Sequence, residues 1–125
     1  MGRGLSPLQR QILLIAEENR RARRRRGGRA DVYTAEVYAR VYGFEPMPGR
    51  DPRDPSTETF SHEQIGASAY NRAAASVSRA LRRLEERGLL TREPRAGGRL
   101  TPAGQRQAAA LIADDSPGAP PAQSA

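Results

Sequence analysis

The feature that most constrains the fold of this 125-residue chain is a long amphipathic segment in its second half. It begins at residues 61–64, Ser-His-Glu-Gln, where a serine followed three residues later by glutamine has the pattern of a helix capping box. We predict one long helix from His62 to Arg87, stopped by Gly88, with Gly66 and the pair Tyr70-Asn71 as points where it can kink or break. The apolar stripe of this helix is Ile65, Ala69, Ala73, Val77, Leu81 and Leu84.

Shorter elements are predicted on both sides of this segment. Ser6-Pro7 has the residue types of an N-cap and a first helical residue, and apolar residues follow at helical spacing. Thr34 can cap a second helix that Gly43 ends. The predicted elements are a helix from Pro7 into the arginine-rich segment, a very short strand at 31–33, a helix at 34–42, a hairpin at 89–101 with Gly97-Gly98 as its turn, and a last helix from Pro102 to Ile112.

Length and composition allow a single domain, which we place at residues 5–112. Within it, residues 44–60 carry four prolines, a density that excludes a helix or a central strand, and we predict a proline-rich insertion loop there. Residues 113–125 are polar and rich in proline, so we expect a disordered tail. The expected fold class is mainly α with a small β-hairpin.

The positive charge of the chain is concentrated in one place. The net charge is +7, and all 21 basic residues are arginine. Seven of them lie between Arg20 and Arg29 with no acidic residue among them, while the other 14 balance the 14 acidic residues. A local excess of this kind is typical of a surface that faces a polyanion. From this block we expect DNA contacts by Arg23, Arg24, Arg25 and Arg26.

Residues 76–90, Ser-Val-Ser-Arg-Ala-Leu-Arg-Arg-Leu-Glu-Glu-Arg-Gly-Leu-Leu, resemble the recognition helix of winged helix-turn-helix regulators such as the MarR and GntR groups. Residues 99–104, Arg-Leu-Thr-Pro-Ala-Gly, resemble the second wing strand of that superfamily where it runs into a terminal helix. The close resemblance covers residues 76–104, and the earlier helices fit by pattern only. Residues 65–71 are less specifically similar to small uncharacterised proteins of phages and mobile elements. The resemblance implies a winged helix-turn-helix fold.

The polar face of the long helix carries the candidate DNA contacts. A helix fits the major groove, where arginine can read guanine through two hydrogen bonds and serine can reach a base or a phosphate. Ser76, Ser78 and Arg79 have these properties, whereas Arg72, Arg82 and Arg83 are better placed for phosphates. An arginine on a narrow hairpin suits the minor groove. The predicted DNA contacts outside the basic block are Asn71, Arg72, Ser76, Ser78, Arg79, Arg82 and Arg83 on the helix, and Arg92, Arg95 and Arg99 on the hairpin.

The segment between Gly43 and Ser61 is much longer than the three- or four-residue turn of a helix-turn-helix. Two arrangements satisfy the sequence. In the first, residues 34–42 are the positioning helix and the long helix carries recognition; in the second, residues 62–69 are the positioning helix and recognition begins near Arg72. The unbroken apolar stripe favours the first, and Asn71 and Arg72 are the residues whose contact with the groove depends on the choice.

We expect the protein not to be an enzyme. It has no cysteine, and His62 is its single histidine, so a zinc site lacks ligands and an HExxH pattern lacks its second histidine. Asp51, Asp54 and Glu58 lie in the insertion, without the fixed scaffold that a magnesium-dependent nuclease needs. No glycine-rich nucleotide-binding pattern is present. We therefore expect no cofactor, no metal and no small-molecule effector.

The sequence thus predicts a sequence-specific double-stranded DNA-binding protein that regulates transcription. Two alternatives remain open: a replication or partition factor of a mobile element, and a winged-helix interaction module whose basic face docks an acidic partner protein. No apolar run is long enough to span a membrane, and the N-terminal residues lack the pattern of a signal peptide. We expect a cytoplasmic, nucleoid-associated protein with no membrane partner.

We also predict a homodimer. Leu13 and Leu14 lie outside the main apolar stripe of the first helix, and the last helix is too short to be stable alone. A single winged helix reads only a few base pairs, whereas a two-fold dimer reads two half-sites. The predicted interface residues are Leu13, Leu14, Leu111 and Ile112.

Overall fold

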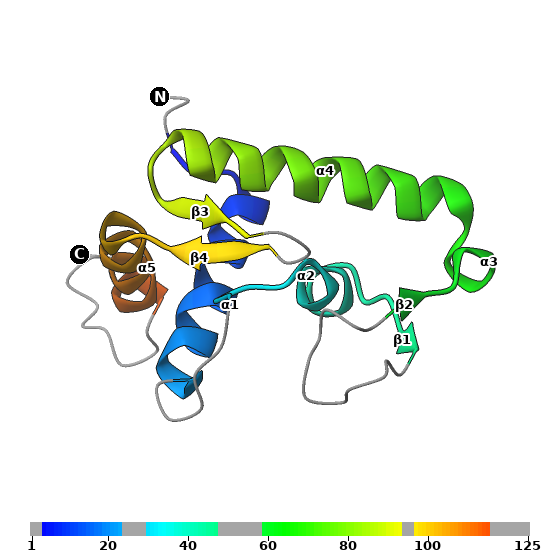
Figure 1. The fold of residues 1–125 in the computed structure, drawn as a ribbon, viewed down its shortest axis with the longest axis horizontal. Helices are drawn as coiled ribbons and strands as arrows, with labels where there is room; N and C mark the ends of the chain where they lie inside the picture. Colours follow the sequence, from blue (N-terminus) through cyan, green and yellow to red (C-terminus); the bar gives the residue numbers. More distant parts are fainter. Residues whose placement is uncertain (1–3, 24–29, 48–58, 94–96, 116–125) are drawn as a thin grey trace, which may run out of the picture.

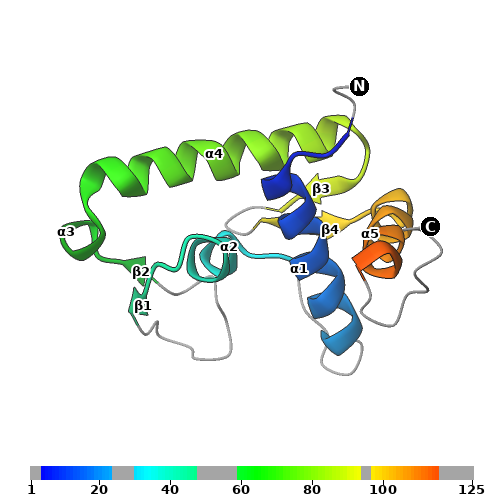
Figure 2. The same cartoon turned by 180° about the vertical axis from the view of Figure 1, so that it is seen from behind.

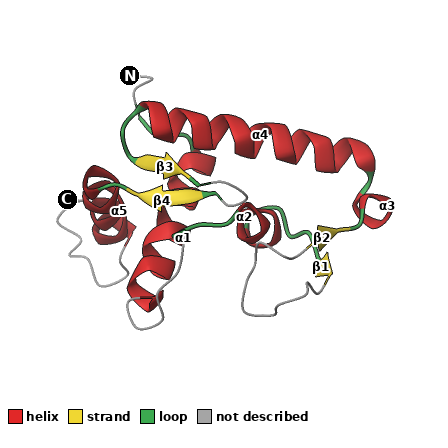
Figure 3. Ribbon diagram, in the orientation of Figure 1, coloured by secondary structure: helices red, strands yellow, loops and turns green. Residues whose placement is uncertain are grey.

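The computed structural model describes residues 4–23, 30–47, 59–93 and 97–115. These residues are mostly helical with a small antiparallel hairpin near the C-terminus, which confirms the expected fold class at this level. The elements are α1 (Pro7–Arg23), α2 (Thr34–Arg40), β1 (Pro46–Met47), β2 (Thr59–Phe60), α3 (His62–Ile65), α4 (Ala67–Glu86), β3 (Leu90–Arg92), β4 (Gly98–Leu100) and α5 (Pro102–Asp115). Helix α4 runs along one edge of the molecule, and α1 crosses behind the β3–β4 hairpin (Figures 1 and 3).

The core lies where α1, α4, α5 and the hairpin meet. Its largest fully buried side chains include Ile12, Leu13, Leu81 and Leu84. Leu13 has 0% of its surface exposed and Leu111 has 6%, because α1 packs against α5 on one side and against α4 on the other. The prediction that these two leucines meet a second copy is therefore wrong, since each is buried within its own chain.

The hairpin pairs Leu90 with Leu100, so that both apolar side chains reach the core. At the other edge of β4, Val32 forms an isolated bridge with Gly98, which is the observed remnant of the strand predicted at 31–33. The prediction that Gly97-Gly98 form the turn is wrong, because Gly98 belongs to β4 and the link at 94–96 lies outside the described residues. A Cβ on Gly97 would lie 2.6 Å from the Val32 carbonyl oxygen. The absence of a side chain at Gly97 therefore allows Val32 to approach the hairpin.

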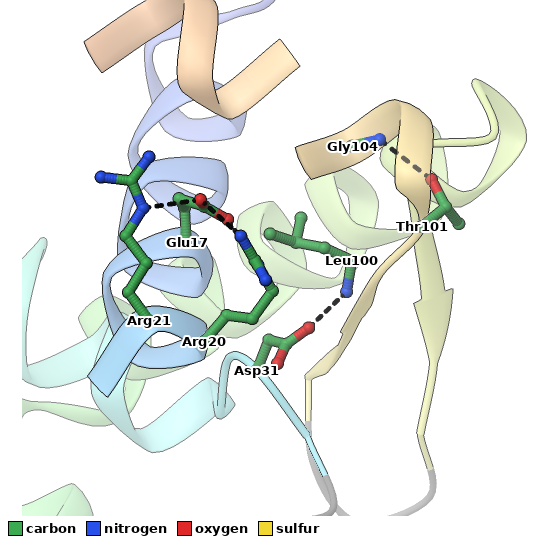
Figure 4. Close-up of polar contacts among 7 residues, drawn as sticks. All are labelled: Glu17, Arg20, Arg21, Asp31, Leu100, Thr101 and Gly104. Carbon is green, nitrogen blue, oxygen red and sulfur yellow. Dashed lines mark hydrogen bonds and ion pairs between the residues drawn. The ribbon is translucent and has the colours of Figure 1, made fainter. Parts of the chain in front are cut away.

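Short-range contacts fix the junctions at both ends of the hairpin. Gly88, with φ of 76°, follows α4, and the Leu89 N–H donates to the Leu84 carbonyl at 3.0 Å, which closes the helix as predicted. Thr101 caps α5, because its Oγ1 accepts from the Gly104 N–H at 3.0 Å (Figure 4). A Cβ on Gly104 would collide with the Leu89 carbonyl oxygen. The Thr-Pro-Ala-Gly sequence thus joins hairpin and helix closely.

Buried polar side chains hold α1, α2 and β4 together. The side chain of Asp31 accepts a hydrogen bond from the Leu100 N–H at 2.7 Å, and Asp31 is 6% exposed (Figure 4). Asn19 on α1 donates from Nδ2 to the Asp31 carbonyl at 3.0 Å and to the Glu36 carboxylate at 2.8 Å. Glu36 in turn accepts from the Tyr33 N–H at the start of α2 at 3.1 Å. One network therefore sets the position of the hairpin relative to both helices.

The long helix is interrupted near its start. Ser61 caps α3 as predicted, with its Oγ accepting from the Gln64 N–H at 3.2 Å, but Gly66 has φ of 98° and separates α3 from α4. The predicted helix is therefore divided at Gly66, one of the two points where the sequence allows a kink or break, and residues 62–65 form the separate short helix α3. Helix α4 is continuous through Tyr70-Asn71, so the second arrangement, with a new helix starting near Arg72, is not observed.

The proline-rich insertion is not a loop throughout. Its two ends pair as the short antiparallel strands β1 and β2, while residues 48–58 lie outside the described residues. Aromatic rings from α2, the insertion and α4 gather beside these strands, with neighbouring centroids 5.5 to 6.5 Å apart, and burial raises the pKa of the Tyr38 hydroxyl. This aromatic cluster supports the N-terminal half of α4. Its members are Tyr38, Tyr42, Phe44, Phe60 and Tyr70, and the His62 ring lies 4.1 Å from that of Tyr70.

The C-terminal helix is longer than predicted. Helix α5 continues to Asp115, so the disordered tail expected from residue 113 is wrong for residues 113–115, and residues 116–125 lie outside the described residues. Within the part of the chain that the structure describes, none of the helices combines the length and the apolar character needed to cross a membrane.

Candidate nucleic-acid interface

Helix α4 turns one face to the core and the opposite face to the surface. Ala73, Val77, Leu81 and Leu84 are buried. In Figures 1 and 2 the helix forms the upper edge of the molecule, and no other described element lies beyond it. The structure therefore brings together on one broad surface all of the predicted contacts of this helix. Asn71, Arg72, Ser78, Arg79, Arg82 and Arg83 are exposed, and Ser76 is half-buried.

The arginines of this surface lack acidic partners. No acidic residue occurs in the sequence between Glu63 and Glu85. Arg72, Arg82 and Arg83 form no ion pair or side-chain hydrogen bond with any residue that the structure describes, and Arg79 contacts only the Ser76 hydroxyl, at 3.5 Å. Guanidinium groups without carboxylates remain available for phosphate oxygens, which they bind in a bidentate manner.

The arginines of the C-terminal half of α1 are arranged differently. Arg20 and Arg21 both donate to the carboxylate of Glu17, each from Nε at 2.8 Å (Figure 4). The side chain of Glu17 is 2% exposed, and the hydrogen bond from Arg20 is the main reason that its pKa lies below its ordinary value. Arg40 on α2 pairs with Glu18 at 2.7 Å. Two carboxylates thus offset part of the charge of these three arginines.

The C-terminal end of α1, where the basic block begins, lies away from the surface of α4. Helix α1 starts beside α4 and runs away from it, so its last residue, Arg23, lies at the far end of the molecule (Figures 1 and 2). Arg24, Arg25 and Arg26 lie outside the described residues. The structure thus does not bring Arg23 together with the predicted contacts of the long helix.

The predicted contacts of the hairpin fall into three cases. Arg92 is exposed, and its backbone N–H donates to the Glu85 carboxylate at 3.5 Å. Arg99 is exposed but pairs with Glu93 at 3.7 Å, so its charge is partly compensated. Arg95 lies outside the described residues. Glu93, which directly follows β3, therefore offsets part of the charge of Arg99.

A pocket of about 280 Å³ lies between the start of α1 and the flank of α4. The residues that line it from α4 are Ser76, Arg79, Ala80 and Arg83. From the other side it is lined by Ser6, Leu8 and Gln9. Sequence reasoning missed the contribution of Ser6 and Gln9. The signal was present, because serine followed three residues later by glutamine is a capping-box pattern, and the Gln9 N–H donates to the Ser6 hydroxyl at 3.1 Å.

A second groove, of about 480 Å³, lies along α1 and the end of α5. Leu14 and Ile112 are its half-buried apolar residues, and Glu18 and Arg40 stand at its charged side. Of the four predicted interface residues, these two remain accessible. The structure therefore retains half of the predicted dimer surface and places the other half in the core.

Comparisons of the chain with protein-family models, with curated proteins and with solved structures give no match. Among the described residues, no group of three histidine or acidic side chains gathers in the way that a metal ion needs. Inference about function therefore rests on the geometry and charge of the surfaces described above.

Proposed function

We propose that this protein is a winged helix-turn-helix protein that binds double-stranded DNA in a sequence-specific manner and regulates transcription. The observation that carries the proposal is the row of arginines on the exposed face of α4, which have no acidic partner among the described residues. Leaving four guanidinium groups unpaired on one helix is unfavourable in isolation but suits a helix whose ligand is a polyanion.

The order of the elements supports the winged-helix interpretation. Helices α1 and α2 and the four-residue α3 precede α4, the bridge at Val32 adds a third segment to the edge of the hairpin, and the hairpin directly follows α4. In this arrangement α4 is the recognition helix, β3–β4 is the wing and α2 is the positioning helix. The insertion takes the place of the short turn, and its aromatic cluster holds the first turns of α4.

The dimensions of α4 suit the major groove. Its 20 residues span about 30 Å, so the helix can lie along the groove while its core-facing side stays packed. In the proposed complex Ser78 and Asn71 face base edges, and Arg72 and Arg82 contact the phosphates on either side. Arg92 and Arg99 then follow the neighbouring backbone or minor groove from the hairpin.

Selection from a random duplex library, followed by measurement of affinity, tests the proposal directly. We expect enrichment of a defined sequence, bound at least 1000-fold more tightly than scrambled DNA, which is about the lower end for specific binding proteins. Equal and weak binding of every duplex would contradict sequence specificity and would favour a module that docks an acidic protein. No binding to any duplex at low salt would overturn the proposal.

We further propose that the protein binds DNA as a homodimer through the groove along α1 and α5. Leu14 and Ile112 leave apolar surface exposed there. The Glu18–Arg40 pair beside this surface supplies one negative and one positive side chain close to the proposed two-fold contact. A dimer would address two half-sites about one helical turn apart. Exposure of the same residues on both copies makes the contact self-complementary.

Light scattering after size exclusion tests the dimer. We expect twice the chain mass of 13.6 kDa for the wild type, and a folded monomer for Leu14→Glu. Met47→Glu is the matched control, because Met47 is also an exposed apolar residue, belongs to β1 and does not line the groove. A monomer at tens of micromolar, unchanged by DNA, would contradict the dimer.

A further inference from the structure

The pocket between α4 and the start of α1 has a composition unlike the rest of the proposed DNA surface. Ser76, Arg79 and Arg83 are spaced three and four residues apart, so they form one stripe along the flank of α4. Across from this stripe stand Ser6 and Gln9, and the residues lining the pocket include no acidic side chain. Two elements far apart in the sequence therefore meet around two guanidinium groups.

The serines of the pocket keep a hydroxyl proton to donate. The Ser6 Oγ accepts from the Gln9 N–H at 3.1 Å, and the Ser76 Oγ accepts from Arg79 at 3.5 Å. Because a hydroxyl can accept and donate at once, each O–H remains free to point at a ligand. Gln9 is 7% exposed and its Oε1 accepts from the Ser6 N–H at 3.4 Å, which holds the Ser6 side of the pocket in place.

These groups match one class of ligand. Two guanidinium groups and two hydroxyl donors around a small open pocket complement a tetrahedral oxyanion, which accepts several hydrogen bonds from different directions. An apolar ligand would leave these polar groups without partners, and a cation would be repelled. Among the described residues, no carboxylate lines the pocket that could occupy the position of such an anion.

We propose that this pocket binds one backbone phosphate of the DNA and thereby sets how far along the groove α4 sits. The proposal rests on the proposed DNA-binding function and goes beyond it in one respect. It assigns Arg79 to the backbone, whereas the sequence alone suggests that Arg79 reads a base. Base reading then falls to the opposite flank of α4, where Asn71 and Ser78 are exposed.

Paired affinity measurements on the selected duplex and on a scrambled duplex test this assignment in the full-length protein. We expect Arg83→Ala to lower affinity about 8-fold on both duplexes at 0.1 M salt, and to make the slope of log K against log salt less steep by about 0.9. Arg79→Ala should do the same. Arg83→Lys, which keeps the charge but loses the planar fork, should lose less affinity.

Arg106→Ala is the matched control, because Arg106 is an exposed arginine on α5 and does not line the pocket. It should change affinity less than twofold. Thermal unfolding of each variant checks that the fold is retained. If Arg83→Ala behaves like Arg106→Ala, or if its loss is confined to the selected duplex, the assignment of the pocket to a backbone phosphate is overturned.

A second experiment locates the phosphate. Duplexes in which single phosphates are replaced by neutral methylphosphonates should contain one position that weakens the wild type and has no further effect on Arg83→Ala. Additive losses at every position would overturn the proposal, as would binding of inorganic phosphate combined with unchanged DNA affinity of Arg83→Ala. If the wild type binds no duplex, both proposals fall; if it binds but Arg83→Ala matches the control, only the pocket assignment falls.

Discussion

Helices α4 and α1 carry equal numbers of arginines, but these arginines differ in whether a carboxylate lies beside them. On α1, Arg20 and Arg21 share the buried carboxylate of Glu17. On α4, Arg72, Arg82 and Arg83 have no acidic partner among the described residues. Both regions are basic by composition, but only the second leaves its charge available to a ligand.

This difference shows that the partners of a charge matter more than the count of charges. A window that starts at Arg20 contains no acidic residue, but the helical period brings Glu17 within reach of both arginines, at i+3 and i+4. The basic block is therefore partly compensated from one turn upstream. On α4, Arg72 and Arg79 have no carboxylate within four residues in the sequence, and Glu85 and Glu86, which lie within four residues of Arg82 and Arg83, form no ion pair with them among the described residues.

The largest effect expected from the uncompensated surface is a steep salt dependence. If about six phosphates are contacted, the slope of log K against log salt should be near −5, and affinity for the selected duplex should fall on the order of 1000-fold between 50 and 200 mM salt. Fluorescence anisotropy across this range measures it. A slope near zero would mean that the arginines of α4 do not meet phosphates.

Removing two arginines from each region compares them directly. Arg72→Ala with Arg82→Ala should lower affinity roughly 50-fold at 0.1 M salt, because each lost phosphate contact removes about 0.9 from the slope. The matched double substitution, Arg20→Ala with Arg21→Ala, should change affinity less than twofold. Similar losses for the two double variants would break the distinction between the two helices.

Glu17→Gln should separate folding from binding. The substitution removes a buried charge that accepts hydrogen bonds from two arginines, and we expect a loss of about 2 kcal/mol in unfolding free energy at pH 7 with little change in DNA affinity. Glu18→Gln, whose exposed ion pair with Arg40 is worth less, should cost about 0.5 kcal/mol or less. Chemical denaturation measures both.

The same substitution has a predicted pH dependence. Because the pKa of Glu17 is lowered in the folded protein, its contribution is fully present above its ordinary value of 4.5 and is lost as pH falls through the lowered value. The difference in stability between wild type and Glu17→Gln should therefore shrink in acid. A difference that stays constant from pH 7 to pH 3 would show that the charge of Glu17 is not what stabilises the fold.

The smallest expected effect concerns specificity. Ser78→Ala removes one hydroxyl from the outer face of α4, and we expect about a fivefold loss on the selected duplex with a smaller loss on scrambled DNA. Gln107→Ala on α5, another exposed polar residue, is the control. Equal loss of affinity on both duplexes would indicate that Ser78 contacts the DNA backbone and not the bases.

Local periodicity was sufficient to predict most helices. The stripes of α1 and α4, the stop at Gly88 and the Thr101 cap depend on residues within a few positions of one another, and these predictions agree with the structure. The exposed side chains of α4 followed from the same pattern. Both the helices and the exposed surface of the candidate site were therefore largely predictable from the sequence.

Errors arose where distant segments decide the outcome. Leu13 looked like an extra apolar residue because the sequence does not say that α1 is covered by both α5 and α4. Gly97 looked like a turn residue because the approach of Val32, 65 residues earlier in the chain, was not visible. The pocket beside α4 depends in the same way on the start of α1, which only the tertiary fold brings near Arg83.

The contact between Asp31 and β4 has a consequence for solubility. A short sheet normally leaves an open edge, whose free N–H groups can pair with a strand of another molecule and start aggregation. Here the backbone of Val32 satisfies Gly98, and the Asp31 carboxylate occupies the next donor, the N–H of Leu100. One acidic side chain thus takes the position of a third strand. Loss of that carboxylate would leave the Leu100 N–H without its acceptor at this edge, and β4 would then be open to pairing with a strand of another molecule.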